Sequence, residues 1–289
     1  MTSLQEPTRP RRSLLFVPGL RPDMFAKALA AGADMVCVDV EDAVVHSRKD
    51  EARGIALSLF GNAAPGHIEQ VLRINSVATL DGLKDLQAIL QAETPPPALM
   101  LPKVKSAEEI HLLAELLRGR CGHIRFHVII ETNQGLERVY EIAHASQRID
   151  SLLFGAVDLS ADLRCAKSWD NLLYARSRLA HAAAAAGVDL LDVPYLQIDD
   201  LEGLRAEALR SASLGFTGKA AIHPKHLEII HEAFSPDPAT VARARKVIAA
   251  FAQDPTGLVV IDGELIELPV VRSLRRALAI AERIEATKT

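Results

Sequence analysis

Short apolar runs alternate with longer amphipathic stretches along most of the chain. The runs are rich in Val, Ile and Leu and are nearly continuous, which is typical of parallel strands buried on both faces. Charged or turn-forming residues separate each run from the next stretch. This pattern predicts eight strands, at residues 14–18, 35–40, 71–75, 98–103, 126–132, 151–158, 190–195 and 218–224.

The amphipathic stretches between these runs predict helices. Pro22 and Gly32 mark the start and the end of the first one. Strands that alternate with helices predict a (β/α)8 barrel, the TIM barrel. A doubly wound sheet is the alternative, but no GxGxxG motif opens a strand–helix unit, which disfavours a dinucleotide fold. The clearest helical periodicity lies at residues 23–31, 107–117, 172–186 and 201–214.

The last part of the chain has a different pattern. Helices are predicted at residues 226–234, 239–252 and 270–286, with a hairpin at residues 257–269 around Asp262 and Gly263. We therefore expect a barrel domain at residues 1–225. Residues 226–289 are expected to form a lid or an arm that packs on the barrel or on a neighbouring subunit.

Composition restricts the possible partners. The net charge is −4 and aromatic residues make up 4% of the 289 residues, so no nucleic-acid partner is expected. No apolar stretch is long enough to span a bilayer, and the first residues do not resemble a signal peptide. Three cysteines without a CxxC pair indicate reduced thiols and a cytoplasmic protein; they are Cys37, Cys121 and Cys165.

Polar side chains gather at the carboxyl ends of the predicted strands. In a TIM barrel these ends meet at one rim, where the active site forms. Side chains that are scattered along the sequence would therefore form a single cluster. The residues concerned are Asp39, Glu41, Asp42, Arg73, Asn75, Lys103, Glu131, Asp158, Asp192, Tyr195 and His223.

Glu131 and Asp158 follow consecutive predicted strands. Two carboxylates, together with water and substrate oxygens, form a typical Mg²⁺ site. The alternative is that each carboxylate caps the helix that follows it. For either residue alone the cap is the better explanation, whereas the pair within a polar cluster favours the metal.

Arg73 is expected to lie partly buried at the barrel mouth, because it follows two apolar residues. Its guanidinium suits a substrate carboxylate or a developing enolate, and the alternative is a structural ion pair with Glu41 or Asp42. Asp39 and these two acids are predicted to orient Arg73 and Lys103 or to bind metal-bound water. So many acids favour charged Lys103 over a Schiff-base nucleophile.

Other side chains give weaker signals. Asp192 and His223 are candidate ligands of the substrate, although a lone histidine is as often a structural residue. No Cys/His group has the spacing of a zinc site. No GxSxG motif appears, which argues against a serine hydrolase.

Several motifs, in the same order along the chain, resemble the citrate lyase β-subunit-like (CitE-like) family of the HpcH/HpaI aldolase superfamily. Any one of them is weak, but together they are specific and cover nearly the whole chain. They are RRSLLFVPG (residues 11–19), GADMVCVDVEDAV (32–44), VLRIN (71–75), LPKV (101–104), IIETNQG (129–135), FGAVDLSADL (154–163), GFTGKAAIHP (215–224) and DGELIELPVV (262–271).

The resemblance implies a TIM barrel that binds Mg²⁺ and an acyl-CoA and that assembles as a trimer or a dimer of trimers. It implies that Glu131 and Asp158 are the metal ligands, that Arg73 contacts the substrate and that Arg12 lies near the CoA phosphates. An acid on the lid of such proteins can act as acid or base in a neighbouring active site. Glu267 occupies that position here in place of the usual Asp, with Leu265 in place of the usual Met.

The resemblance also implies a reaction. A 3-hydroxyacyl-CoA such as malyl-CoA or citramalyl-CoA is cleaved to a 2-oxo acid and an acyl-CoA enolate. From their place in the polar cluster at the rim, Glu41 and Asp42 are expected to support the catalytic groups. Three alternatives stay open. They are a citrate lyase β subunit acting on a carrier-protein thioester, a metal-dependent aldolase that acts on free 2-oxo acids without CoA, and a non-catalytic protein that binds CoA or a metabolite.

Overall fold

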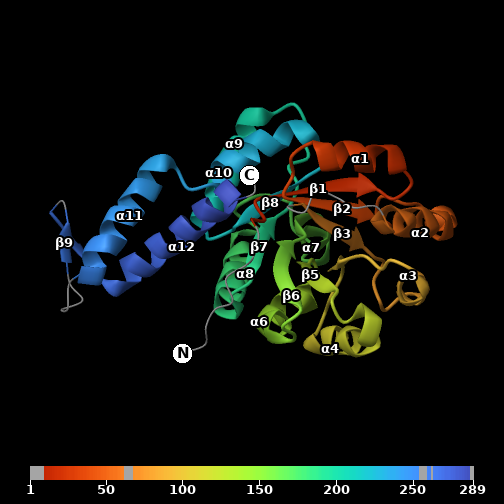
Figure 1. Ribbon diagram of the computed structural model, residues 1–289. Coiled ribbons are helices and arrows are strands. Elements are labelled where there is room, and N and C mark those ends of the chain that lie inside the picture. Colours follow the sequence, from red (N-terminus) through yellow and green to blue (C-terminus); the bar gives the residue numbers. More distant parts are fainter. Residues whose placement is uncertain (1–9, 62–67, 254–258, 262, 287–289) are drawn as a thin grey trace. The chain divides into compact units, whose positions relative to one another are not determined.

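Eight parallel strands form a closed barrel in the computed structural model, which describes residues 10–61, 68–253, 259–261 and 263–286. Each strand pairs with its neighbours in sequence order, and β8 closes the barrel against β1 (Figure 1). The predicted TIM barrel is therefore confirmed. The strands are β1 (Ser13–Pro18), β2 (Met35–Asp39), β3 (Glu69–Arg73), β4 (Ala98–Leu101), β5 (Arg125–Ile130), β6 (Ile149–Phe154), β7 (Asp189–Asp192) and β8 (Gly218–Ala221).

The barrel interior is filled with apolar side chains. Alternate residues of a strand point inward, as with Met35 and Cys37 of β2. Their neighbours on the same strand point outward, toward the helices. The inward-facing cluster includes Leu14, Val71, Ala98, Met100, Ile129, Leu153, Leu191 and Ala220.

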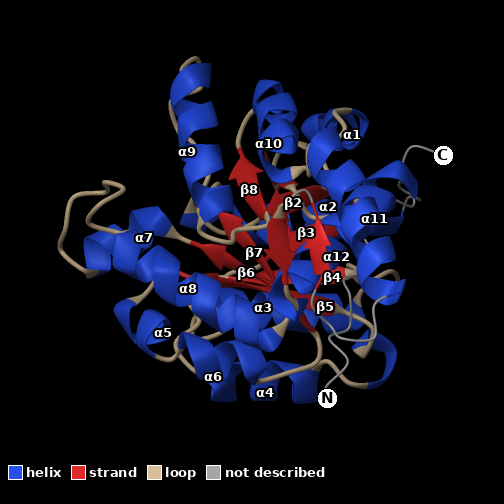
Figure 2. Ribbon diagram, turned by 90° about the vertical axis from the view of Figure 1, so that its left-hand side faces the viewer, coloured by secondary structure: helices blue, strands red, loops and turns tan. Residues whose placement is uncertain are grey.

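Helices surround the strands, as Figure 2 shows. Thr132 and Asp200 cap the helices that they precede, because their side chains accept hydrogen bonds from backbone amides three residues later. The helices of the barrel unit are α1 (Pro22–Ala30), α2 (Lys49–Ser58), α3 (Leu80–Gln91), α4 (Ala107–Leu116), α5 (Asn133–Glu137), α6 (Val139–His144), α7 (Ala156–Asp162), α8 (Leu173–Ala186), α9 (Leu201–Ser213) and α10 (Leu227–Phe234).

Most strands are shorter at their carboxyl ends than the apolar runs predict. β6 ends at Phe154, Gly155 follows, and α7 begins at Ala156. Asp158 therefore lies in the first turn of a helix, and the prediction that it ends a strand is wrong. The strand and the helix both bury apolar residues here, so the sequence pattern does not reveal the boundary between them.

Charged side chains cross-link the amino-terminal end of the barrel. The buried guanidinium of Arg11 contacts Glu69, Asp150 and Asp189, which lie on three strands, at N–O distances of 2.5, 2.7 and 3.2 Å. Such a pairing is needed because a buried charge without a partner is costly. This end of the barrel is held together by ion pairs, whereas the opposite rim is open.

The chain divides into two compact units, and residues 11–233 make up the barrel unit. The second unit, from residue 234 onward, contains α11 (Pro238–Gln253), β9 (Val259–Ile261), β10 (Glu264–Ile266) and α12 (Leu268–Ala286). β9 and β10 form an antiparallel pair. Of the predicted hairpin turn, Gly263 is described and Asp262 lies outside the described residues.

The second unit has an apolar core of its own. Val247 of α11, Ile266 of β10 and Val271 of α12 are buried against one another. Among the described residues no helix is both long and apolar enough to cross a membrane.

Candidate active site at the carboxyl rim

A cavity of about 420 Å³ opens at the carboxyl rim of the barrel. This volume suits a small ligand. Its charged lining consists of Asp39, Asp42, Arg73, Glu131 and Asp158, which are five of the eleven rim residues expected from the sequence.

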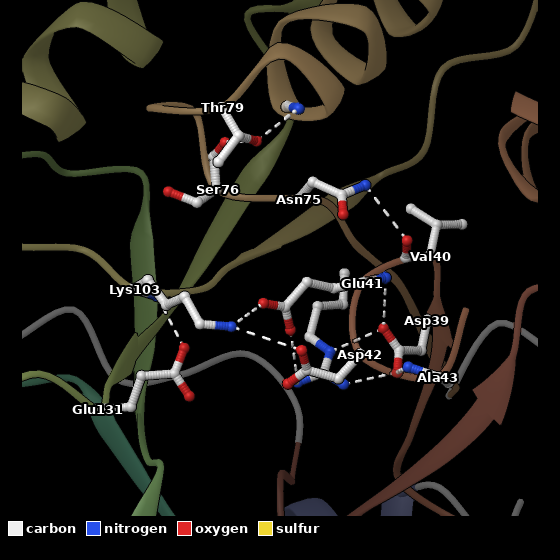
Figure 3. Close-up of polar contacts among 12 residues, drawn as sticks. Asp39, Val40, Glu41, Asp42, Ala43, Asn75, Ser76, Thr79, Lys103 and Glu131 are labelled. Carbon is white, nitrogen blue, oxygen red and sulfur yellow. Dashed lines mark hydrogen bonds and ion pairs between the residues drawn. The ribbon is translucent and has the colours of Figure 1, made fainter. Parts of the chain in front are cut away.

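Glu131 is the first residue after β5 and is 3% exposed. Its Oε1 accepts a hydrogen bond of 2.8 Å from the backbone amide of Lys103 (Figure 3). Its side chain packs on Gly155, where an added Cβ would lie 2.4 Å from Glu131 Cβ and 2.7 Å from Oε2. Only glycine leaves room for the carboxylate at this point.

Asp158 projects from the first turn of α7 into the same cavity. It has no hydrogen bond or ion pair with any residue that the structure describes, and Glu131 Oε2 likewise has no described donor. Burial raises the pKa of Glu131 to about 7, and the charges of Glu41 and Asp158 act in the same direction. Two neighbouring carboxylates with free oxygens and uncompensated charge fit a hard divalent cation.

The raised pKa of Glu131 predicts a pH-dependent stability of the metal-free protein. The folded-state pKa of Glu131, about 7, exceeds its ordinary value of about 4.3, so the folded protein binds a proton at Glu131 more tightly than the unfolded chain does. The contribution of this proton to the free energy of unfolding is complete below the ordinary pKa and is lost as pH rises through 7. In EDTA, urea unfolding should show Glu131→Gln to be more stable than wild type by about 3 kcal/mol at pH 8, with no difference near pH 4.

Glu141→Gln is the matched control for this measurement, since Glu141 is exposed on α6. It should leave the pH dependence unchanged. An equal difference between Glu131→Gln and wild type at all pH values would contradict the expectation.

Arg73 is held in place by acids of β2 and the following loop. Its Nε and Nη2 donate to the two oxygens of Asp39 at 2.8 and 2.5 Å, and its Nη1 lies 3.1 Å from Glu41 Oε2. The guanidinium carbon lies 5.0 Å from the centre of the Phe16 ring. Asp39 also accepts from the backbone amides of Glu41 and Ala43, at 2.8 and 3.2 Å. The position of Arg73 is therefore compatible with both predicted roles, a structural ion pair and contact with a ligand in the cavity.

Lys103 connects the arginine side of the cavity to Glu131. Its Nζ is ion-paired with Glu41 and lies 3.5 Å from Asp42 Oδ1, as Figure 3 shows. Burial opposes the charge of Lys103, but Glu41 raises the pKa of the ammonium above its ordinary value. Lys103 therefore stays protonated, which argues against a Schiff base. Its φ of +56° is strained for a side chain other than glycine, and this backbone carries the amide that binds Glu131.

Three predicted ligands are not brought into this cluster. Arg12 precedes β1 at the opposite end of the barrel, and its guanidinium binds Asp34 at 2.8 and 2.9 Å. This position does not support contact with a thioester in the rim cavity. His223 is exposed after β8, and its Nδ1 accepts from the amide of Lys225 at 3.2 Å.

Asp192 is completely buried and points away from the barrel axis, because its neighbour Leu191 points inward. Its Oδ2 binds Lys219 at 2.8 Å and Ser211 at 2.7 Å. The prediction that Asp192 contacts substrate at the rim is therefore wrong. Consecutive strand residues face opposite sides of the barrel wall. The sequence LLDV does not alternate between apolar and polar residues, so it does not indicate which side chains face the barrel axis.

Sequence reasoning missed the apolar wall of the cavity. These residues come from β1, β5 and β6, from α1 and from the segments after β6, β7 and β8. No motif distinguishes them from core residues before the barrel is assembled. They are Phe16, Met24, Ile129, Leu153, Val157, Val193, Leu196 and Ile222.

A barrel with free carboxylates, an arginine and an apolar wall around one rim cavity defines an enzyme site for a small anionic substrate. The chain belongs to the HpcH/HpaI aldolase/citrate lyase family, whose model matches residues 12–224. The family resemblance predicted from the motifs is thus confirmed.

Individual relatives match over nearly the whole chain. The (3S)-malyl-CoA thioesterase of Cereibacter sphaeroides is 36% identical, with 96% of each chain covered. The mitochondrial citramalyl-CoA lyase of Homo sapiens is 31% identical, covering 96% of this chain and 87% of the relative. The crystal structure of CitE from Mycobacterium tuberculosis in complex with magnesium, acetoacetate and coenzyme A is 32% identical. It has a TM-score of 0.79 and covers 95% of this chain and 99% of that chain.

Proposed function

We propose that this protein is a Mg²⁺-dependent carbon–carbon lyase that cleaves, or in reverse condenses, a 3-hydroxyacyl-CoA such as citramalyl-CoA or malyl-CoA. The products of cleavage are acetyl-CoA, or a related acyl-CoA, and a 2-oxo acid. The observation that carries the proposal is the pair of carboxylates Glu131 and Asp158 in the cavity that also contains Arg73, because Glu131 Oε2 and both oxygens of Asp158 have no partner among the described residues. Relatives named for CoA thioesters, and one crystallised with magnesium and coenzyme A, support it.

Glu131 and Asp158 would hold the metal ion, which supplies Lewis-acid polarisation of the substrate oxygens. A base removes the proton of the 3-hydroxyl group, and the carbon–carbon bond breaks to give a 2-oxo acid and the enolate of the acyl thioester. Arg73 lies in the cavity with its cation fixed by Asp39, so it can stabilise the enolate charge without rearranging. Protonation of the enolate carbon completes the cleavage.

We assign the acid/base role to Glu267, which is exposed next to β10 in the second unit. Replacing it with Gln should lower kcat about a hundredfold, because general acid–base groups contribute on this scale. The dependence of rate on Mg²⁺ concentration should stay as in wild type. Glu264→Gln is the matched control, because Glu264 is also exposed and lies three residues earlier. If Glu267→Gln had the kcat of wild type, Glu267 would not be the acid/base group.

We further propose a cytoplasmic homo-oligomer, a trimer or a hexamer. All three cysteines are free thiols, which supports a reducing compartment. If Glu267 serves a neighbouring subunit, mixing Glu267→Gln protein with Glu131→Ala protein under conditions that allow subunit exchange should restore activity. Light scattering of the purified chain tests the assembly itself.

A panel of thioesters tests the reaction. Malyl-, citramalyl-, citryl- and hydroxymethylglutaryl-CoA are incubated with Mg²⁺ and the isolated chain, and acyl-CoA, 2-oxo acid and free CoA are quantified. Equal amounts of acyl-CoA and 2-oxo acid are expected from at least one substrate. Free CoA released without a 2-oxo acid would indicate thioester hydrolysis instead.

The same panel separates the alternatives. A citrate lyase β subunit would act on citryl-acyl-carrier protein and not on free acyl-CoA. An aldolase without CoA would cleave free hydroxy acids, and a non-catalytic protein would bind CoA without turnover of any substrate.

A further inference from the structure

A second cavity, of about 400 Å³, lies beside the catalytic one. Val193, Pro194 and Leu196, in the segment between β7 and α9, line both cavities. The rest of the second lining comes from the same segment, from the start of α7, from the segment before α8, and from α8 and α9. These three helices lie on one side of the barrel in Figure 2. None of the rim carboxylates or cations lines it, so the proposed lyase reaction does not account for this cavity.

Arg176 is the central polar group of this second cavity. It is 3% exposed, yet none of its guanidinium nitrogens has a hydrogen-bond acceptor among the described residues. The nearest carboxylate oxygen, Asp192 Oδ1, lies 3.4 Å from Nε and is itself without a hydrogen-bond donor. A buried guanidinium without acceptors is costly, and a bound anion would supply them.

Aromatic rings fix the plane of this guanidinium. Its carbon lies 4.6 Å from the centre of the Phe154 ring and 4.4 Å from that of Trp169. Arg210 also stacks on Trp169, at 4.3 Å. A guanidinium held in this way presents a fixed fork that matches a carboxylate.

The surrounding charges indicate how much negative charge the cavity accepts. Arg176 and Lys219 are matched by Asp192 and Glu207, to which Lys219 is bonded at 2.8 and 2.7 Å. Lys167 on the lining adds one further positive charge. A ligand with one negative charge therefore makes the cavity neutral, whereas a ligand with two would leave an excess of negative charge beside Glu207.

We propose that this second cavity is a binding site for a small organic monocarboxylate. The carboxylate pairs with Arg176 and Lys167, and the carbon chain lies against Leu172 and the Val193–Pro194 wall. The site is separate from the thioester site, and its occupancy does not require Mg²⁺.

Trp169 provides the readout, because it is the only tryptophan of the chain. The experiment uses Glu131→Ala/Asp158→Ala protein in EDTA, so that binding at the proposed metal site is removed. Sodium butyrate is titrated at constant ionic strength, maintained with NaCl. A saturable change of tryptophan emission is expected, with half-saturation unaffected by an excess of free CoA.

Variants of the lining establish the location. Arg176→Lys should weaken butyrate binding at least about tenfold, since it loses the fork. Arg178→Lys is the matched control on the same helix, because Arg178 binds the backbone carbonyls of Leu136 and Glu137 instead. If Arg176→Lys does not fold, Lys167→Ala is the second variant, because Lys167 is exposed and its loss should not affect folding. Lys167→Ala should weaken butyrate binding several-fold.

Three results would overturn the proposal. The absence of any saturable change would mean that the cavity holds only water. Tighter binding of succinate or phosphate than of butyrate would contradict the single charge. Displacement of butyrate by CoA would make the cavity a part of the thioester site.

Discussion

Asp158→Asn should lower the rate of thioester cleavage roughly a thousandfold at saturating Mg²⁺, and Glu131→Ala should do the same. An amide at position 158 keeps the volume of the side chain but removes the charge, and the carboxylate has no protein partner whose loss would unfold the site. The effect should therefore fall on metal binding and turnover, with little change in stability. Steady-state kinetics and calorimetric titration with Mg²⁺ measure the two quantities.

Asp162→Asn is the matched control, because Asp162 lies on the same short helix and is exposed. Its Oδ2 accepts a hydrogen bond from the Asn133 amide and is not part of the cavity lining. This variant should turn over within about twofold of wild type. If Asp158→Asn kept wild-type kcat and Mg²⁺ affinity, the metal site would have to be sought elsewhere.

Arg73→Lys should lower kcat by roughly a hundredfold or more and change KM less. Lysine keeps the positive charge, but it cannot make the two parallel bonds to Asp39 and at the same time reach Glu41. The cation would then not be held where the enolate charge develops. Stopped-flow or steady-state measurement of cleavage, with circular dichroism to verify the fold, gives the result.

The same substitution at Arg125 controls for loss of a guanidinium. Arg125 begins β5 at the far end of the barrel and is paired with Asp150. Arg125→Lys should leave kcat unchanged. Equal effects at the two positions would show that Arg73 acts on the barrel as a whole and not on the reaction.

The sequence predicts the strands well because parallel strands bury both faces and leave long apolar runs. Glu131 and Arg73 could be placed at the rim for the same reason, since each stands at the end of such a run. Asp158 was placed less well because Gly155 is the only local sign that β6 has ended. What locates Asp158 is the fold of the whole rim, not the residues around it.

The error at Asp192 has a physical cause. Whether a charged residue near a strand end points to the cavity or to the helices depends on side-chain alternation and on partners far away in sequence. The partner that holds Asp192, Lys219, lies 27 residues away in the sequence. The second cavity was not predictable at all, because a buried Arg176 is indistinguishable in sequence from an exposed one.

The cavity wall has a consequence for how such proteins diverge. The chemical groups come from the ends of β2, β3 and β5 and the start of α7, whereas much of the apolar wall lies on the segments after β6, β7 and β8. Substitutions at Val193, Leu196 or Ile222 can therefore reshape the acyl pocket without moving a catalytic group. Directed evolution of new specificities should therefore begin at these three positions, where a change of substrate need not disturb the chemistry.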